Sequence, residues 1–260
     1  MAHALQNPAK AKLAAGGLVL CLNIRQMRSV ESAMIAQACD FDVIVVDREH
    51  TPISAELTSG ICVAALAIGM TPLVRVASPS ARDIGHALDA GALGVIVPQV
   101  NNRADAQAVV NYSKYPPIGR RSVAALGPAM RYQPPGLVES LRMQNEATLI
   151  CVLLETAEAI ESAREIAAVP GIDVLIVGSV DLSTEFGEPG RFDSIKVQEA
   201  YAVVAAAAFA EKKHFTIAGG SREQQAKSVS MGARMLMGGM DVNYFMSAAK
   251  QETAALRKLL

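Results

Sequence analysis

The chain has 260 residues, 51% of them hydrophobic, and its 24 Lys and Arg against 25 Asp and Glu give a formal net charge of −1. This length and apolar content predict one globular domain over residues 1–260 and exclude a largely disordered chain. The balanced charge and short apolar runs argue against nucleic-acid and membrane partners, and the first residues lack a signal-peptide pattern, so we expect a cytoplasmic protein.

Eight short apolar runs indicate strands, and a segment that we expect to be helical follows each of them. In chain order the runs occupy residues 18–23, 42–47, 72–76, 94–97, 150–154, 174–177, 215–218 and 234–237. The expected helices occupy 25–38, 55–68, 81–89, 104–112, 156–169, 197–211, 224–231 and 242 to the end, with an irregular stretch over 116–135. Continuous apolarity is typical of parallel strands buried on both faces. Eight such units predict an α/β fold, a (β/α)8 TIM barrel. An open doubly wound sheet is the alternative, although no GxGxxG motif follows the first run.

Two carboxylates follow neighbouring predicted strands. Glu155 comes after the run 150–154, and Asp181 comes shortly after the run 174–177. Parallel strands joined by a crossover helix end on the same edge of a sheet, so these side chains could face one point. Such a pair suggests a hard divalent cation such as Mg²⁺, completed by water and substrate oxygens. The alternative is that Glu155 caps the next helix and Asp181 is an ordinary loop residue.

Other polar residues are also expected at the carboxyl ends of the strands. His50 could act as a general base or make only a local hydrogen bond. Arg75 lies in an apolar strand and should meet a protein carboxylate or an anionic substrate. Asp89 ends a predicted helix, where a carboxylate is unfavourable, so we suspect a partner such as a histidine, with a solvated turn as the alternative. The glycine pairs at 219–220 and 238–239 could bind phosphate or allow close packing.

Schiff-base chemistry would need a desolvated lysine at this edge, and the strand ends contain none. We therefore expect a metal to stabilise a carbanion. The four cysteines form no CxxC pair, and Cys21 and Cys151 lie in apolar runs as expected for buried, reduced thiols.

Six stretches together resemble the HpcH/HpaI aldolase family, metal-dependent pyruvate aldolases of the phosphoenolpyruvate/pyruvate barrel superfamily. They are FDVIVVDREHTP (41–52), PLVRV (72–76), LDAGALGVIVPQVNN (88–102), KYPPIGRRSV (114–123), LLETAEAI (153–160) and VGSVDLS (177–183). The resemblance implies a barrel whose last helix is exchanged between subunits of a homo-oligomer, a hexamer built as a trimer of dimers. It implies a class II lyase that cleaves a 4-hydroxy-2-oxoacid into pyruvate and an aldehyde through a metal-stabilised enolate, as in the breakdown of aromatic compounds.

The resemblance also implies residue roles. Glu155 and Asp181 would bind Mg²⁺, Mn²⁺ or Co²⁺, and Arg75 would hold the keto or enolate oxygen. Backbone N–H groups of the turn formed by Gly178, Ser179, Val180 and Asp181 would bind the pyruvate carboxylate. His50 would be the acid/base, oriented by Asp89, which in this family can come from a neighbouring subunit. Asp47 would lie near the aldehyde-derived hydroxyl.

The sequence departs from the family pattern at Leu153, Arg48 and Ser179-Val180, so the substrate could differ. Arg48 could bind an acidic or larger substrate or pair with a nearby carboxylate. Related metal-enolate enzymes, such as an oxaloacetate decarboxylase or an acyl-CoA lyase, are one alternative. A barrel that binds a metabolite without catalysis is another.

Overall fold

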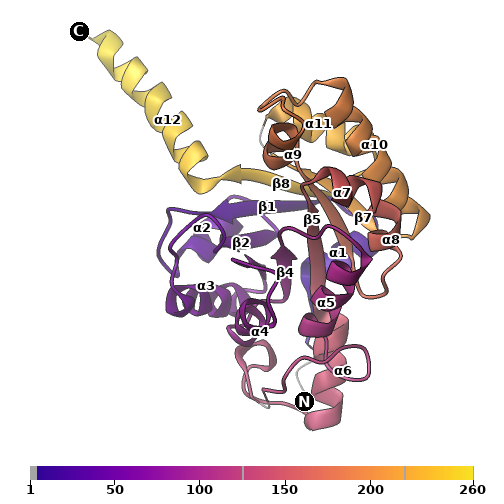
Figure 1. Ribbon diagram of the computed structural model, residues 1–260. Coiled ribbons are helices and arrows are strands. Elements are labelled where there is room, and N and C mark those ends of the chain that lie inside the picture. Colours follow the sequence, from indigo (N-terminus) through magenta and orange to yellow (C-terminus); the bar gives the residue numbers. More distant parts are fainter. Residues whose placement is uncertain (1–4, 125, 220, 260) are drawn as a thin grey trace.

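Eight parallel strands close into a barrel in the computed structural model, which describes residues 5–124, 126–219 and 221–259 (Figure 1). The strands are β1 (Val19–Ile24), β2 (Val43–Asp47), β3 (Thr71–Arg75), β4 (Gly94–Val97), β5 (Leu149–Leu154), β6 (Val174–Gly178), β7 (His214–Ala218) and β8 (Met235–Met240). Each pairs with its neighbours in chain order, and β8 pairs with β1. The predicted (β/α)8 barrel is confirmed, and the open sheet is excluded.

The helices that follow the strands lie largely where the sequence predicted them. They are α2 (Ser32–Ala38), α3 (Ala55–Ala67), α4 (Ala81–Asp89), α5 (Arg103–Ser113), α7 (Ala157–Glu161), α8 (Ala163–Ala167), α10 (Ile195–Ala210), α11 (Arg222–Ser230) and α12 (Asp241–Leu256). Five elements were not predicted from the sequence: the helices α1 (Pro8–Ala14), α6 (Leu137–Ala147) and α9 (Ser179–Glu185) and the short 3-10 turns η1 (Pro128–Met130) and η2 (Arg257–Leu259).

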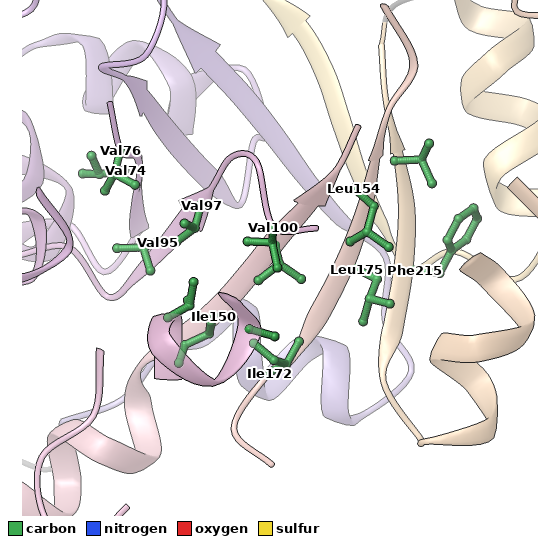
Figure 2. Packing of buried hydrophobic residues seen from close by; sticks show 14 of the residues in the cluster. Val74, Val76, Val95, Val97, Val100, Ile150, Leu154, Ile172, Leu175 and Phe215 are labelled. Carbon is green, nitrogen blue, oxygen red and sulfur yellow. The ribbon is translucent and has the colours of Figure 1, made fainter. Parts of the chain in front are cut away.

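Alternate residues of each strand face opposite sides of the barrel wall. Val43 and Val45 belong to the cluster inside the barrel, whereas Ile44 and Val46 belong to the cluster between the strands and the surrounding helices. Figure 2 shows part of the outer cluster, with side chains such as Val95, Ile150, Leu175 and Phe215. Because of this two-residue period, the inward-facing residue at the carboxyl end of each strand points into the barrel mouth.

The N-terminal end of the barrel is closed by α1. Ala9 and Leu13 of this helix join the interior cluster. The side chain of Asn7 accepts a hydrogen bond from the N–H of Lys10 and donates to the carbonyls of Leu93 and Ala147. The carboxyl ends of the strands therefore provide the open mouth of the barrel.

The last helix, α12, points away from the barrel (Figure 1). Asp241 at its start is buried, but Phe245 is 72% exposed. The exchange of this helix between subunits stays a prediction. None of the helices within the described ranges is both long and apolar enough to span a membrane.

Candidate functional site

A cavity of about 550 Å³ opens at the carboxyl ends of the strands. This volume suits a small metabolite. Most of the predicted site residues line it: His50, Arg75, Glu155, Gly178, Ser179, Val180 and Asp181. The lining also includes Asn23, Arg25, Leu153, Met237 and Asn243.

Glu155 is the most deeply buried carboxylate of the cavity lining, with 8% of its surface exposed. It follows Leu153 by two residues, so the strand period directs it inward. Burial is the main cause that raises the pKa of its carboxyl to about 7, and the negative charges of Glu49 and Asp181 add to this effect. Two contributions oppose the rise: a 3.2 Å hydrogen bond from the N–H of Gln99 and the positive charge of Arg75. A cation beside Glu155 would therefore relieve an unfavourable negative charge.

Gln99 and Gly178 hold Glu155 in this position from two sides. Gln99 has a φ of 57°, a left-handed conformation that is unusual for a residue with a side chain. A Cβ atom on Gly178 would lie only 2.5 Å from Cγ and Oε1 of Glu155. Glycine at the end of β6 therefore leaves the space that the Glu155 side chain fills.

Asp181 lies on a helix rather than in the turn that the sequence analysis expected. The helix α9 begins at Ser179, directly after β6, and places Asp181 in its first turn, exposed at the cavity. The first N–H groups of a helix have no acceptor within it, and they favour a nearby anion. The Ser179 hydroxyl is buried and accepts a 2.8 Å hydrogen bond from the hydroxyl of Tyr201.

The two carboxylates fit a metal that keeps part of its coordination for water and substrate. Among the described residues, no three His, Cys, Asp or Glu side chains form a ready-made metal cage. Mg²⁺ is commonly held by one or two carboxylates and substrate oxygens. The raised pKa of Glu155, with Asp181 on the same cavity wall, therefore agrees with the predicted ligand pair.

Arg75 is held in the cavity wall by two carboxylates. Its Nε lies 2.9 Å from Asp47 Oδ1, its Nη2 lies 2.5 Å from Asp47 Oδ2, and its Nη1 lies 3.3 Å from Glu49 Oε2. Asp47 is 1% exposed and also accepts the N–H groups of Glu49 and His50. Although its burial opposes ionisation, the guanidiniums of Arg75 and Arg25 hold the pKa of Asp47 below its usual value. In this structure Asp47 thus orients Arg75, and its contact with an aldehyde-derived hydroxyl stays a prediction.

His50 lines the cavity and lies beside the carboxylate of Glu49. His50 has a 47% exposed side chain, and its Nε2 lies 3.6 Å from Glu49 Oε2. Burial raises the pKa of Glu49, while Arg75 and His50 oppose the rise. The exposed imidazole is placed to exchange a proton with a bound molecule.

Asp89 is not brought to His50 within the chain. Its Oδ1 lies 2.6 Å from Arg121 Nη2, and its side chain is 43% exposed. No hydrogen bond joins Asp89 to His50 among the residues that the structure describes. The predicted orientation of His50 by the Asp89 of a neighbouring subunit therefore stays a prediction.

Arg25 is a cavity residue that the sequence analysis missed. Its Nε donates a 2.7 Å hydrogen bond to Asp47 Oδ2. Residues 25–31 were expected to be helical, but α2 begins only at Ser32. A residue distant in sequence prevents the helix from starting earlier, because the Asp241 carboxylate accepts the N–H groups of Arg25, Gln26 and Met27. The sequence contains one signal for the inward position of Arg25: it follows Cys21 and Asn23 at two-residue steps, the period at which side chains of a strand face the same side.

The glycine pair at the end of β8 serves close packing. A Cβ on Gly238 would lie 2.5 Å from the carbonyl oxygen of Cys21. The N–H of Gly239 already donates to the hydroxyl of Tyr244, at 2.8 Å. This pair therefore does not support the phosphate alternative. Of the pair after β7, Gly220 lies outside the described residues.

Comparisons with known proteins agree with this geometry. The family model for HpcH/HpaI aldolase/citrate lyase matches residues 23–248. A 4-hydroxy-4-methyl-2-oxoglutarate aldolase of Chaetomium globosum is 34% identical over 97% of this chain and 96% of its own length. A 4-hydroxy-2-oxo-heptane-1,7-dioate aldolase of Shigella sonnei is 30% identical over 95% of this chain and 93% of its own. The crystal structure of an HpcH/HpaI aldolase from Desulfitobacterium hafniense superposes with a TM-score of 0.91, at 26% identity over 96% of this chain and 97% of that one. As the sequence resemblance predicted, the chain belongs to the HpcH/HpaI aldolase/citrate lyase family.

Proposed function

We propose that this protein is a divalent-metal-dependent aldolase that cleaves a 4-hydroxy-2-oxoacid into pyruvate and a second carbonyl compound. The observation that carries the proposal is the buried Glu155 carboxylate, which shares one cavity with Asp181, Arg75 and His50. The family and the aldolase activities of its relatives make the chain a carbon–carbon lyase that acts on small oxoacids.

Glu155 and Asp181 would hold the cation, which would be Mg²⁺, Mn²⁺ or Co²⁺. Such a cation, when bound, supplies positive charge that stabilises the negative charge developing on the pyruvate half of the substrate. The N–H groups at the start of α9 would attract the carboxylate of that half.

The remaining steps belong to Arg75 and His50. His50 removes the proton of the C4 hydroxyl, directly or through a water molecule. The C3–C4 bond breaks, the second carbonyl compound leaves, and the bonding electron pair forms the enolate of pyruvate. Arg75, which Asp47 and Glu49 fix in place, stabilises the enolate oxygen because its donors need no reorganisation. Protonation at C3 then gives pyruvate.

Pyruvate release from a panel of 4-hydroxy-2-oxoacids, with oxaloacetate included, tests the proposal. We expect EDTA to stop turnover and added Mg²⁺ or Mn²⁺ to restore it. Glu155→Gln and Asp181→Asn should each lose metal binding and turnover, whereas Glu158→Gln, at an exposed carboxylate of α7 outside the cavity lining, should retain both.

Other outcomes of the same assay would contradict the aldolase proposal. Turnover in metal-free buffer would exclude the assigned cation role. Turnover of oxaloacetate alone would indicate a decarboxylase, and activity on a CoA thioester alone would indicate an acyl-CoA lyase. Metal binding with no turnover of any of these compounds would favour a metabolite-binding barrel.

We also propose that the protein assembles as a homo-oligomer, a hexamer of three dimers, in which α12 is exchanged between partners. Tyr244, Phe245 and Met246 near the start of α12 are 48%, 72% and 45% exposed in the single chain. A cluster of exposed aromatic and sulfur-containing side chains on a projecting helix is typical of a buried interface. Contact with a partner would remove this apolar surface from water.

A further inference from the structure

Arg25 places a second guanidinium beside Arg75 in the cavity. Both guanidiniums contact the same atom, Asp47 Oδ2, at 2.7 Å from Arg25 Nε and 2.5 Å from Arg75 Nη2. Arg75 also reaches Glu49 through Nη1. By contrast, the hydrogen bonds within the described part of the chain engage the Arg25 side chain only through its Nε and leave its two terminal nitrogens without a protein acceptor.

The barrel topology gives these groups an order across the mouth. In the closed order from β1 to β8, β5 lies opposite β1, and β3 lies between them. Glu155 follows β5, Arg75 ends β3, and Arg25 follows β1. A substrate whose pyruvate half lies at Glu155 and Arg75 would therefore have Arg25 on the β1 side of the mouth, within the space open to its far half.

The charge of Arg25 is only partly balanced by the protein. Asp47 is one carboxylate shared by two guanidiniums, and the side chain of Arg25 is 27% exposed at the cavity. A guanidinium whose two terminal nitrogens are free matches the geometry of a carboxylate, which can accept one N–H from each of them. A neutral far half would leave these donors to water.

We propose that Arg25 binds a carboxylate on the far half of the substrate, so that the preferred substrates are 4-hydroxy-2-oxo dicarboxylates and the second product is itself an oxoacid. This inference rests on the proposed aldolase function. It makes Arg25 a specificity-determining residue, whose contact lies away from the bond that breaks.

The test compares two substrates that differ in that carboxylate. 4-Hydroxy-2-oxoglutarate would release pyruvate and glyoxylate, and 4-hydroxy-2-oxopentanoate would release pyruvate and acetaldehyde. We expect the wild-type protein to prefer the former. Loss of a charge-assisted pair in Arg25→Met or Arg25→Gln should lower the preference, measured as the ratio of the two kcat/KM values, by about ten- to hundredfold, mainly through KM. Arg25→Lys should restore part of the preference.

A merely structural role for Arg25 predicts a different pattern. If Arg25 acted only by holding Asp47 and hence Arg75, its variants would lower turnover of both substrates by the same factor, as we expect for the matched control Asp47→Asn. That result, or a wild-type preference for the monocarboxylate, would overturn the inference. Failure of the aldolase proposal itself looks different, because the wild-type protein with Mg²⁺ or Mn²⁺ would then release pyruvate from neither substrate.

Discussion

Replacing Gly178 with alanine should displace Glu155 without unfolding the barrel. The added Cβ would lie 2.5 Å from Glu155 Cγ and Oε1, whereas ordinary contacts begin at 3.4 Å, so the side chain must retreat by about 0.9 Å. The backbone of Gly178, at φ −82° and ψ 88°, lies outside the left-handed region that requires glycine. The substitution therefore perturbs the Glu155 contact, and the atoms that must move belong to a side chain that can rotate.

The consequence should fall on metal binding rather than on stability. Since a displacement of about 1 Å at a reacting centre costs on the order of 100-fold in rate, we expect Gly178→Ala to lose about that factor in kcat/KM and to bind Mn²⁺ far more weakly. Isothermal titration with Mn²⁺ and the pyruvate-release assay measure the two effects. Gly85→Ala is the matched control, because no atom lies within 4 Å of its added Cβ in α4.

Two results would refute this reasoning. Wild-type Mn²⁺ affinity in Gly178→Ala would show that Glu155 is not a metal ligand or that the contact relaxes elsewhere. A large loss of thermal stability in Gly178→Ala but not in Gly85→Ala would show that the barrel wall, rather than the Glu155 side chain, gives way.

Three further predictions concern Glu155 and α12. The pKa of Glu155 is about 7 in the metal-free protein, and the cation needs the ionised carboxylate. Mn²⁺ affinity measured by titration should therefore be about tenfold weaker at pH 6 than at pH 8. An unchanged affinity would contradict the assignment of Glu155 as a metal ligand. Because the pKa of Glu155 is raised from an ordinary value of 4.5 to about 7, the metal-free protein should lose stability as pH rises from 4.5 to 7, on the order of 3 kcal/mol from this group. In urea unfolding, Glu155→Gln should lack this contribution to the dependence of the unfolding free energy on pH. Phe245→Asp in α12 should dissociate the oligomer in analytical ultracentrifugation, whereas a monomeric wild-type protein would exclude the exchange of α12.

The strands and the inward-facing residues could be predicted because both depend on local patterns. Continuous apolar runs mark strands buried on both faces. The two-residue period then directs Asp47, Arg75 and Glu155 inward, since each follows residues that pack inside the barrel. A local pattern suffices wherever the sheet itself sets the direction of a side chain.

The errors arose where a distant residue decides the local structure. Residues 25–31 have helical spacing, but the carboxylate of Asp241 captures the N–H groups at 25–27 and keeps this segment as a loop. The first turn of α9 was expected to be a turn without a helix. The partner of Asp89 within the chain, Arg121, was also not predicted, while the contact of Asp89 with His50 of a neighbouring subunit stays a prediction. In the first and third cases the partner lies more than 30 positions away, beyond any local pattern.

The charges around the cavity explain why cation and substrate binding should depend on each other. Four carboxylates (Asp47, Glu49, Glu155 and Asp181) face two guanidiniums (Arg25 and Arg75), a formal excess of two negative charges when all of them are ionised and His50 is set aside. An anionic oxoacid would be repelled by that excess, and a single divalent cation would cancel it. With the cation in place, the terminal N–H groups of Arg25, which no acceptor among the described residues engages, would attract a second carboxylate. A dicarboxylate should therefore raise the apparent metal affinity more than a monocarboxylate does, and Arg25→Met should abolish that difference in Mn²⁺ titrations, because binding couplings are reciprocal.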